Sequence, residues 1–351
     1  MIPYVEIKDK YDLKTVAIVE PQECWFELSY QDVGEFEIFC RASKANLLAL
    51  QKGRYVKLPN KRFIWVITSV RYTFTAGGAR MISATGYEAK WLLHKRCILT
   101  PKELQGTITN AVYGLVNHAL GTGAQSARKI VGFTVDTNDL LIDISGTQAP
   151  RGNLLEFVNP LLKQYNCGSI VEFVNGTLKY RIFTGEVKTQ SVRFSQSLDN
   201  LLSSDYLTDD AEKATSVLVV SKVEDVDYTQ THDTGATGID RAEVLVESNI
   251  STKYEDANGE EKETTPDSTL YKGWMLEEGK NKLAEHITIE EVKGEIDIVN
   301  SIYAFDDDFF IGDMVKVQDE YFNFFVNSTI SKYTFKQDAN GYGEEAEYGG
   351  K

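Results

Sequence analysis

The sequence has few cysteines and histidines, no long apolar run and no basic cluster, and each absence excludes a class of protein. The four cysteines are far apart, so no pair has the spacing of a zinc knuckle or a redox dithiol. They are Cys24, Cys40, Cys97 and Cys167. Scattered cysteines in a chain of 351 residues are typical of small buried side chains in a reducing compartment.

Membrane and export signals are also missing from the sequence. No stretch approaches the roughly 20 apolar residues that a bilayer-spanning helix needs. The N-terminal segment has no basic region followed by an apolar run, so we expect no signal peptide. The sequence therefore predicts a protein without membrane contact that is made and kept in the bacterial cytoplasm until it is assembled.

Positive charge is scarce. Lys and Arg number 37 against 52 Asp and Glu, which gives a formal net charge of −15. No Lys/Arg-rich stretch is present to neutralise nucleic-acid phosphates, and an acidic surface is repelled by anionic lipid. These numbers disfavour a nucleic-acid-binding protein, and the acidic balance mainly indicates solubility.

Residue patterns that carry catalysis or bind metals are absent too. The histidines, His94, His118, His232 and His286, have no partners at metal-ligand spacing, and no HExxH, GxSxG or EF-hand pattern occurs. The acidic run 306–308, with Asp313 nearby, has the oxygen ligands that a hard cation prefers but lacks the spacing of a known loop, so we favour a solvated turn. The sequence predicts no enzyme, cofactor or metal.

The residues that are present favour β-structure. Alternating or β-branched runs predict strands at 35–38, 63–70, 216–220, 296–303, 314–317 and 322–335. Hairpin turns are expected at Gly77-Gly78, Asn175-Gly176 and Asn258-Gly259, and a further Asn-Gly pair at 340–341 opens an acidic tail. The polar stretch 223–269 predicts a long solvent-facing β-excursion or mobile loop.

Helical spacing is confined to a few segments. It predicts helices at 43–53, where Gly53 ends the helix, and at 106–121, 153–165 and 276–286, with a kink or break near Asn159 because Pro160 follows it. The fold class is therefore mainly β with minor α. We expect three domains: a β-rich domain at 1–100, a helix-containing α+β domain at 101–200, and a second β-rich domain at 201–351.

Two motifs resemble a known family. The first is ATGYEAKWLLHKRCI, residues 84–98, and the second is YAFDDDFFIGDMVKV, residues 303–317. Their distinctive residues are Gly86, Tyr87, Glu88, Trp91, Leu92, Leu93, Arg96, Gly312 and Asp313. In this order they resemble the Gp37-like tail proteins of siphoviruses that infect Gram-positive bacteria, over about residues 5–345.

That family is similar to the baseplate hub proteins of contractile tails. The resemblance implies a homotrimer in the virion tail tip, whose protomers each contribute two small β-barrel domains, 1–100 and 201–351, to a pseudo-sixfold ring. The ring would adapt the sixfold tail tube to a threefold tip, with tail-tube proteins above, tip or fibre proteins below, and phage DNA passing through an acidic lumen that repels it.

The implied residue roles are structural. Gly86 and Gly312 would serve the backbone at a strand end and a turn, and Trp91, Leu92 and Leu93 would pack a short helix against a barrel. Two other functions remain open: a receptor- or carbohydrate-binding tail-tip component, which needs an exposed aromatic platform, and, less favoured, a cell-wall hydrolase.

Overall fold

The structure is a computed structural model that describes residues 2–74, 78, 80–144, 146–297, 301–321 and 324–349. The strands in these ranges are β1 (Val5–Lys8), β2 (Thr15–Val19), β3 (Glu23–Ser29), β4 (Glu35–Arg41), β5 (Tyr55–Lys57), β6 (Ile64–Phe74), β7 (Arg80–Glu88), β8 (Cys97–Ile98), β9 (Lys102–Leu104), β10 (Phe133–Val135), β11 (Thr147–Ala149), β12 (Gly152–Asn153), β13 (Gly168–Val174), β14 (Thr177–Phe183), β15 (Arg193–Ser195), β16 (Leu201–Asp209), β17 (Ser216–Val223), β18 (Val226–Asp233), β19 (Glu243–Glu247), β20 (Lys253–Glu255), β21 (Glu261–Glu263), β22 (Ile289–Ile296), β23 (Met314–Asp319), β24 (Phe324–Asp338) and β25 (Gly341–Gly349). The helices are α1 (Lys44–Ala49), α2 (Ile108–Leu120), α3 (Leu154–Gln164) and α4 (Thr269–Glu285), with 3-10 turns η1 (Ala89–Lys95), η2 (Gln196–Leu198) and η3 (Gly238–Asp240).

A single large sheet joins strands from both ends of the chain. Its order is β16-β22-β25-β24-β3-β4-β7-β6-β5-β1-β2, with β23 attached to β24 and β15 attached to β23. The connection between the two ends is the antiparallel pairing of β24 with β3, in which Phe335 lies opposite Phe26. The fold is therefore mainly β with minor α, as predicted. The two barrel domains stay a prediction, since the described pairings run from β16 to β2.

Three hydrophobic clusters hold the chain together. The first lies along the large sheet and combines N-terminal residues such as Trp65 with C-terminal residues such as Phe305 and Tyr333, whose rings stack 3.8 Å apart. The second packs α2 and α3 against β13 and β14, and the third lies under α4. Many of the aromatic side chains thus fill the core between segments that are distant in sequence.

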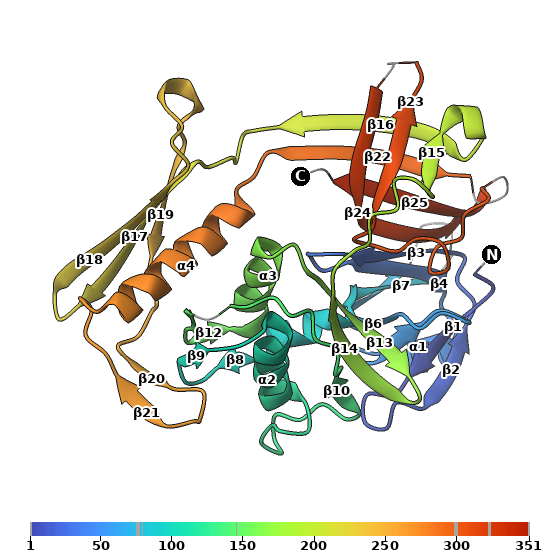
Figure 1. Ribbon diagram of the computed structural model, residues 1–351. Helices are drawn as coiled ribbons and strands as arrows, with labels where there is room; N and C mark the ends of the chain where they lie inside the picture. Colours follow the sequence, from blue (N-terminus) through green and yellow to red (C-terminus); the bar gives the residue numbers. More distant parts are fainter. Residues whose placement is uncertain are drawn as a thin grey trace.

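Residues 210–288, here called the arm, extend from the large sheet on the long strands β16 and β22 (Figure 1). In the arm α4 packs against the three-stranded sheet β18-β17-β19, and β20 and β21 form a separate hairpin. At Gly279 of α4 an added Cβ would lie 2.9 Å from Val219 Cγ2, so helix and sheet are in close contact. The polar segment 223–269 is thus a β-excursion.

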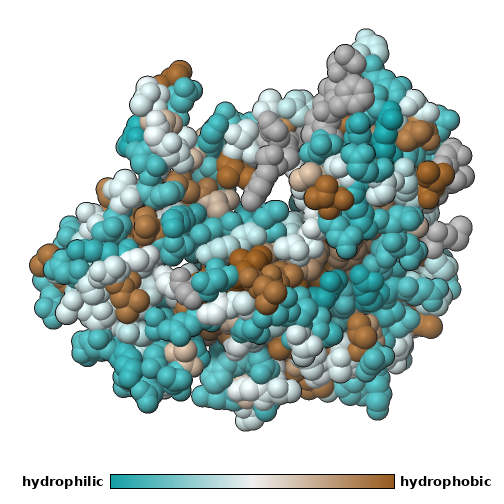
Figure 2. Space-filling view, in the orientation of Figure 1, coloured by the Kyte–Doolittle hydropathy of each residue, from teal (hydrophilic) through white to brown (hydrophobic). Residues whose placement is uncertain are grey.

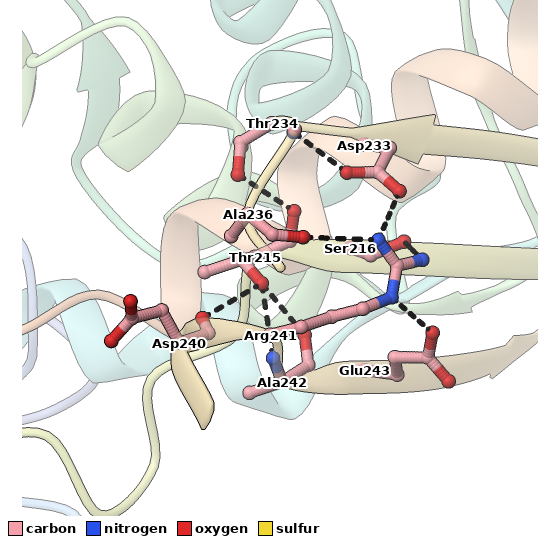
Figure 3. A network of polar contacts seen from close by, with 10 residues as sticks. Thr215, Ser216, Asp233, Thr234, Ala236, Asp240, Arg241, Ala242 and Glu243 are labelled. Carbon is pink, nitrogen blue, oxygen red and sulfur yellow. Dashed lines mark hydrogen bonds and ion pairs between the residues drawn. The ribbon is translucent and has the colours of Figure 1, made fainter. Parts of the chain in front are cut away.

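A network around Arg241 fixes the loop 234–242 of the arm (Figure 3). The Arg241 guanidinium donates to Asp233 Oδ2 at 2.5 Å, Glu243 Oε1 at 2.6 Å and Ser216 Oγ at 3.2 Å. The three acceptors lie at the ends of β17, β18 and β19, so one side chain joins all three strands.

The same network sets the titration of its carboxylate. The Gly235 backbone amide and the Arg241 guanidinium, which both hydrogen-bond the Asp233 carboxylate, lower its pKa. These contacts hold a loop whose Ile239 side chain is 100% exposed.

Local sequence signals placed several elements correctly. The Asn175-Gly176 turn joins β13 to β14, with both residues at positive φ, and α2 lies within the helix predicted at 106–121. The hairpins β6–β7 and β20–β21 are also present, although Gly77 lies outside the described residues.

Other expectations differ from the structure. Helix α3 continues through Pro160 without a break, and its buried face includes Val158 and Leu161 on either side of the proline. Helix α1 ends at Ala49, short of Gly53, whose amide bonds instead to Ile67 O at 2.7 Å.

The C-terminal part differs from expectation as well. Helix α4 begins at Thr269, seven residues before the predicted start, because Ser268 caps it and Tyr271 and Trp274 are buried in the arm. The acidic segment after Asn340 is not a tail but strand β25, which lies between β22 and β24.

Candidate functional site

The two motifs meet at one loop, residues 29–34, which connects β3 to β4 and is called the junction loop here. The first motif forms the end of β7, all of η1 and β8. The second forms an aromatic turn and the start of β23. Neither its position in the sequence nor its composition marks the junction loop, so sequence reasoning missed it.

Glu88 and Lys90 hold the junction loop from inside the protein. Both side chains are fully buried, and Lys90 Nζ lies 3.5 Å from Glu88 Oε2. Glu88 Oε2 accepts from the amides of Ser29 and Gly34, each at 3.3 Å. Lys90 Nζ donates to Ser29 O at 2.5 Å and to Ser169 O at 2.9 Å. One ion pair therefore connects both ends of the loop to β13.

Burial opposes both charges of this pair. Burial raises the pKa of the Glu88 carboxyl group, and the Lys90 ammonium and the two backbone donors oppose that rise. Burial likewise lowers the pKa of Lys90, and the Glu88 carboxylate opposes that fall. A buried ion pair of this kind gains little over apolar packing, but removing one partner is strongly destabilising.

Gly86 allows β6 and β7 to approach closely. A Cβ at this position would lie 1.9 Å from Val66 O and 2.8 Å from Phe36 Cε1, so no larger residue fits without moving the backbone. Gly86 lies opposite Ile67 on β6 and opposite Phe36 on β4. The predicted backbone role of Gly86 is consistent with this geometry.

The remaining residues of the first motif are divided between surface and core. Tyr87 stacks on Trp91 with ring centroids 5.4 Å apart, while Leu92 and Leu93 are buried in the second hydrophobic cluster. Arg96 donates through Nη2 to Arg128 O at 2.7 Å and anchors the segment that follows α2.

The second motif holds the junction loop through Tyr30. Gly312 has φ +90°, and a Cβ there would lie 2.5 Å from Tyr30 Cε2. A Cβ on Gly168 would lie 2.1 Å from the same ring. The Tyr30 hydroxyl donates to Asn166 O at 2.7 Å and accepts from the Gly185 amide at 3.4 Å. Glycine at these positions therefore makes room for one tyrosine.

Asp313, next to Gly312, accepts hydrogen bonds from backbone amides. Its carboxylate accepts from the amides of Glu186 at 2.8 Å and Phe310 at 2.9 Å, and Lys188 Nζ lies 3.4 Å away. In the acidic run, Asp306 pairs with Arg62 at 2.6 Å. Within the described residues no group of three or more His, Cys, Asp or Glu side chains is placed to hold a metal ion.

Arg62 is a second residue that sequence reasoning missed. Its Nε lies 2.8 Å from Glu172 Oε1, and Arg181 Nη2 lies 2.8 Å from the same oxygen. Together with Asp306, these residues link β13 and β14 to the second motif. The partners are far apart in the sequence, so no local pattern could have indicated the cluster.

The chemistry of the junction is that of a structural clamp. The charged groups of Glu88 and Lys90 are buried and their contacts go to backbone amides and carbonyls, so they hold segments in place. None of the helices in the described parts of the chain is long and apolar enough to span a membrane.

Comparison with known proteins agrees with the two motifs. The family model described as Siphovirus ReqiPepy6 Gp37-like protein matches residues 5–349. None of the curated proteins matches the sequence significantly.

Two solved structures share the fold over nearly their whole length. A tail protein from Neisseria meningitidis MC58 has a TM-score of 0.58 at 12% identity, over 99% of this chain and 96% of that one. The 43 kDa tail protein of prophage MuSo2 from Shewanella oneidensis has a TM-score of 0.57 at 12% identity, over 98% and 97% of the two chains. The chain therefore belongs to the Siphovirus ReqiPepy6 Gp37-like protein family, as the two motifs predicted, and it has the fold of phage tail proteins.

Proposed function

We propose that this protein is a structural component of a phage tail and forms the hub at its distal end. The family match over residues 5–349 carries the proposal, and the fold shared with two tail proteins supports it. The hub is a homotrimer that adapts the sixfold tail tube above it to a threefold tip or fibre below it. It is made in the host cytoplasm and has no catalytic activity.

The strands β2 and β16, which end the main path of the large sheet, suit a ring. Each interface of a closed ring joins two different surfaces of the protomer. Strand β2 ends the sheet on one side and exposes Val16 and Ile18, and β16 ends it on the other side and exposes Leu202 and Leu207. Exposed apolar edge strands are sites for pairing with another chain. We place the contact between neighbouring protomers at these edges.

The acidic balance of the chain suits a conduit for DNA. With a formal net charge of −15, acids facing a lumen would repel DNA and let it pass without binding. Reversing the charge of lumen-facing acids should slow DNA ejection, and unchanged ejection kinetics would contradict this part of the proposal.

Immunogold electron microscopy tests the position in the virion. An antibody to this chain should label particles at the distal end of the tail tube. Labelling of peripheral fibres would contradict the hub and favour a receptor binder, and unlabelled particles would contradict any structural role in the virion.

Native mass spectrometry tests the ring and its edges. The wild-type protein should form a species of three 39.5 kDa chains. Ile18→Asp and Leu207→Asp should each give monomers, and a mixture of the two should give dimers, because each variant keeps one intact edge. Val187→Asp, at a position 76% exposed that lies beside β23 and on neither β2 nor β16, is the control and should remain trimeric. Trimers in either edge variant would refute this placement of the interface.

The structure gives little support to a carbohydrate-binding function for the arm. Tyr254 packs edge-on against Trp274 with ring centroids 4.8 Å apart, and Tyr228 is half-buried, so neither forms an exposed platform in the described residues. Deleting residues 223–269 should leave adsorption to cells unchanged if particles still assemble. Peptidoglycan zymography should show no clearing.

A further inference from the structure

A cleft of about 410 Å³ separates the arm from the body of the protein. The body side is formed by β11 and α3, including Phe157 and Pro160. The arm side is formed by β19 and α4, including Leu245, Trp274 and Asn281. In the space-filling view, brown side chains gather near the centre of this face, over α3 (Figure 2). The lining of the cleft combines apolar side chains, among them Phe157 and Leu245, with polar and charged ones.

Two residues that line the cleft each have a buried polar atom without a partner in the described part of the chain. Trp274 is 1% exposed, yet its Nε1–H has no acceptor among the described residues. About two helical turns further along α4, the buried Oδ1 of Asn281 accepts no hydrogen bond from the described residues. Buried polar groups are nearly always hydrogen-bonded, so these two atoms need partners that the described residues do not supply, and both belong to residues of the cleft wall.

The cleft also contains an unpaired strand edge. Strand β19 ends the order β18-β17-β19, and it runs parallel to β17. Ala242 O accepts from the Thr215 amide at 2.9 Å, and the Ser248 amide donates to Val220 O at 2.8 Å. Because alternate residues face the partner strand, the N–H and C=O groups of Leu245 point away from β17. Leu245 is 60% exposed and lines the cleft, so this edge can receive an extended chain.

The charge around the cleft is negative. Its lining includes Glu156, Glu247, Glu278 and Glu285 against Arg151 and Lys282. Lys282 is already paired with Glu285 at 2.6 Å, and Glu278 accepts from Ser248 Oγ at 2.5 Å. Glu156 and Glu247 are exposed and available to a cation.

We propose that the cleft binds an extended segment of another protein that carries cationic side chains. The segment adds to the free edge of β19 as a further strand and buries an apolar side chain against Phe157 and Leu245. Its hydrogen-bonding groups satisfy Trp274 Nε1 and Asn281 Oδ1, and its cations lie near Glu247. The proposal does not depend on the hub function.

Fluorescence anisotropy with labelled peptides tests the proposal directly. The probe is a blocked peptide of three Lys-Val repeats, whose alternation places valines on one face of an added strand and lysines on the other. A Glu-Val peptide of equal length tests the charge. A Lys-Val peptide with alternate N-methylated amides tests the main-chain pairing. The full-length protein should bind the Lys-Val probe saturably and the other two at least about tenfold more weakly.

Substitutions of cleft residues test whether the peptide binds in the cleft. Trp274→Phe keeps an aromatic ring, smaller than the indole, but removes the N–H, and it should weaken the Lys-Val probe about tenfold, whereas Trp91→Phe outside the cleft should not. Glu247→Lys should weaken it similarly, whereas Glu20→Lys, also at an exposed position, should not. Thermal unfolding of each variant checks that the fold is intact, and Glu247→Lys, on the surface, carries the test if Trp274→Phe is unstable.

Several outcomes would overturn the proposal. They are the absence of saturable binding, equal binding of the Glu-Val peptide, or affinities unchanged in both Trp274→Phe and Glu247→Lys. Self-association that disappears in Glu247→Lys would overturn the assigned occupant, since it would identify a second copy in the cleft. None of these results changes the position of gold label on a virion.

Discussion

Lys90→Met removes the ammonium group from the junction and keeps a side chain of similar length. Two hydrogen bonds disappear with it, from Nζ to Ser29 O and to Ser169 O, and Glu88 loses its counter-ion. Glu88 and Lys90 are 0% exposed, so water does not replace the lost contacts. Breaking one partner of a buried ion pair costs about 3–5 kcal/mol. We expect Lys90→Met to lower the free energy of unfolding by that amount.

Urea unfolding at fixed protein concentration, followed by tryptophan fluorescence, measures this change. Lys95→Met is the matched control, because Lys95 lies on the same 3-10 turn but is exposed. Its loss should be below about 1 kcal/mol, the scale of its exposed contact with the Trp91 ring.

A double-mutant cycle then separates the pair from its surroundings. Glu88→Gln alone leaves the Lys90 ammonium buried without a carboxylate, while Glu88→Gln with Lys90→Met leaves no buried charge. The double variant should therefore lose less stability than the two single variants together, by at least about 1 kcal/mol. A loss below about 1 kcal/mol in Lys90→Met, or additive single variants, would refute the view that this ion pair holds the junction loop.

Two further predictions concern the second motif and the arm. Gly312→Ala should lower the free energy of unfolding by about 2 kcal/mol more than Gly259→Ala does. Both glycines have positive φ, but only at Gly312 would a new Cβ clash with the Tyr30 ring. Urea unfolding measures both losses, and equal losses would contradict this prediction. A backbone amide and Arg241 hold the pKa of Asp233 below its usual range, so the contribution of Asp233 to loop stability is present above about pH 4 and is lost as the pH falls through its lowered pKa. In an NMR titration, Arg241→Gln should move the Asp233 midpoint upward, and an unchanged midpoint would contradict the role of Arg241.

Sequence reasoning succeeded where the determining contacts are local. The Asn175-Gly176 turn and helix α2, whose apolar side chains recur at helical spacing, depend on residues within a few positions of one another. The β-rich fold class follows from the same short-range alternation. These turn, helix and strand preferences depend on each segment itself, so the segment keeps them in the folded chain.

The junction could not be predicted in this way. Tyr30 acquires its role only when Gly312 and Gly168 arrive beside it, and the pairing of β24 with β3 brings together the two ends of the chain. No helical or strand period relates such residues. The two motifs indicated the family, but only the structure connects both of them to one loop.

Strand β25 illustrates a signal that was present but hidden. Ala346 and Tyr348 are buried and alternate with acidic residues, which is the period of a half-buried strand. The high acid content made the segment resemble a tail. Lys336 pairs with Glu345 at 2.6 Å across the hairpin, so the partner strand carries the compensating charge.

Buried motif residues and exposed surface residues should differ in whether their substitution affects stability or interactions. The motif residues Glu88, Gly312 and Asp313 contact backbone or a buried ring, so substituting them should change folding before it changes any interaction. The sheet edges and the arm cleft are different, because their exposed residues contribute little to the core. Substitutions such as Ile18→Asp and Glu247→Lys should therefore leave the unfolding free energy nearly unchanged and alter only assembly or peptide binding, each without affecting the other.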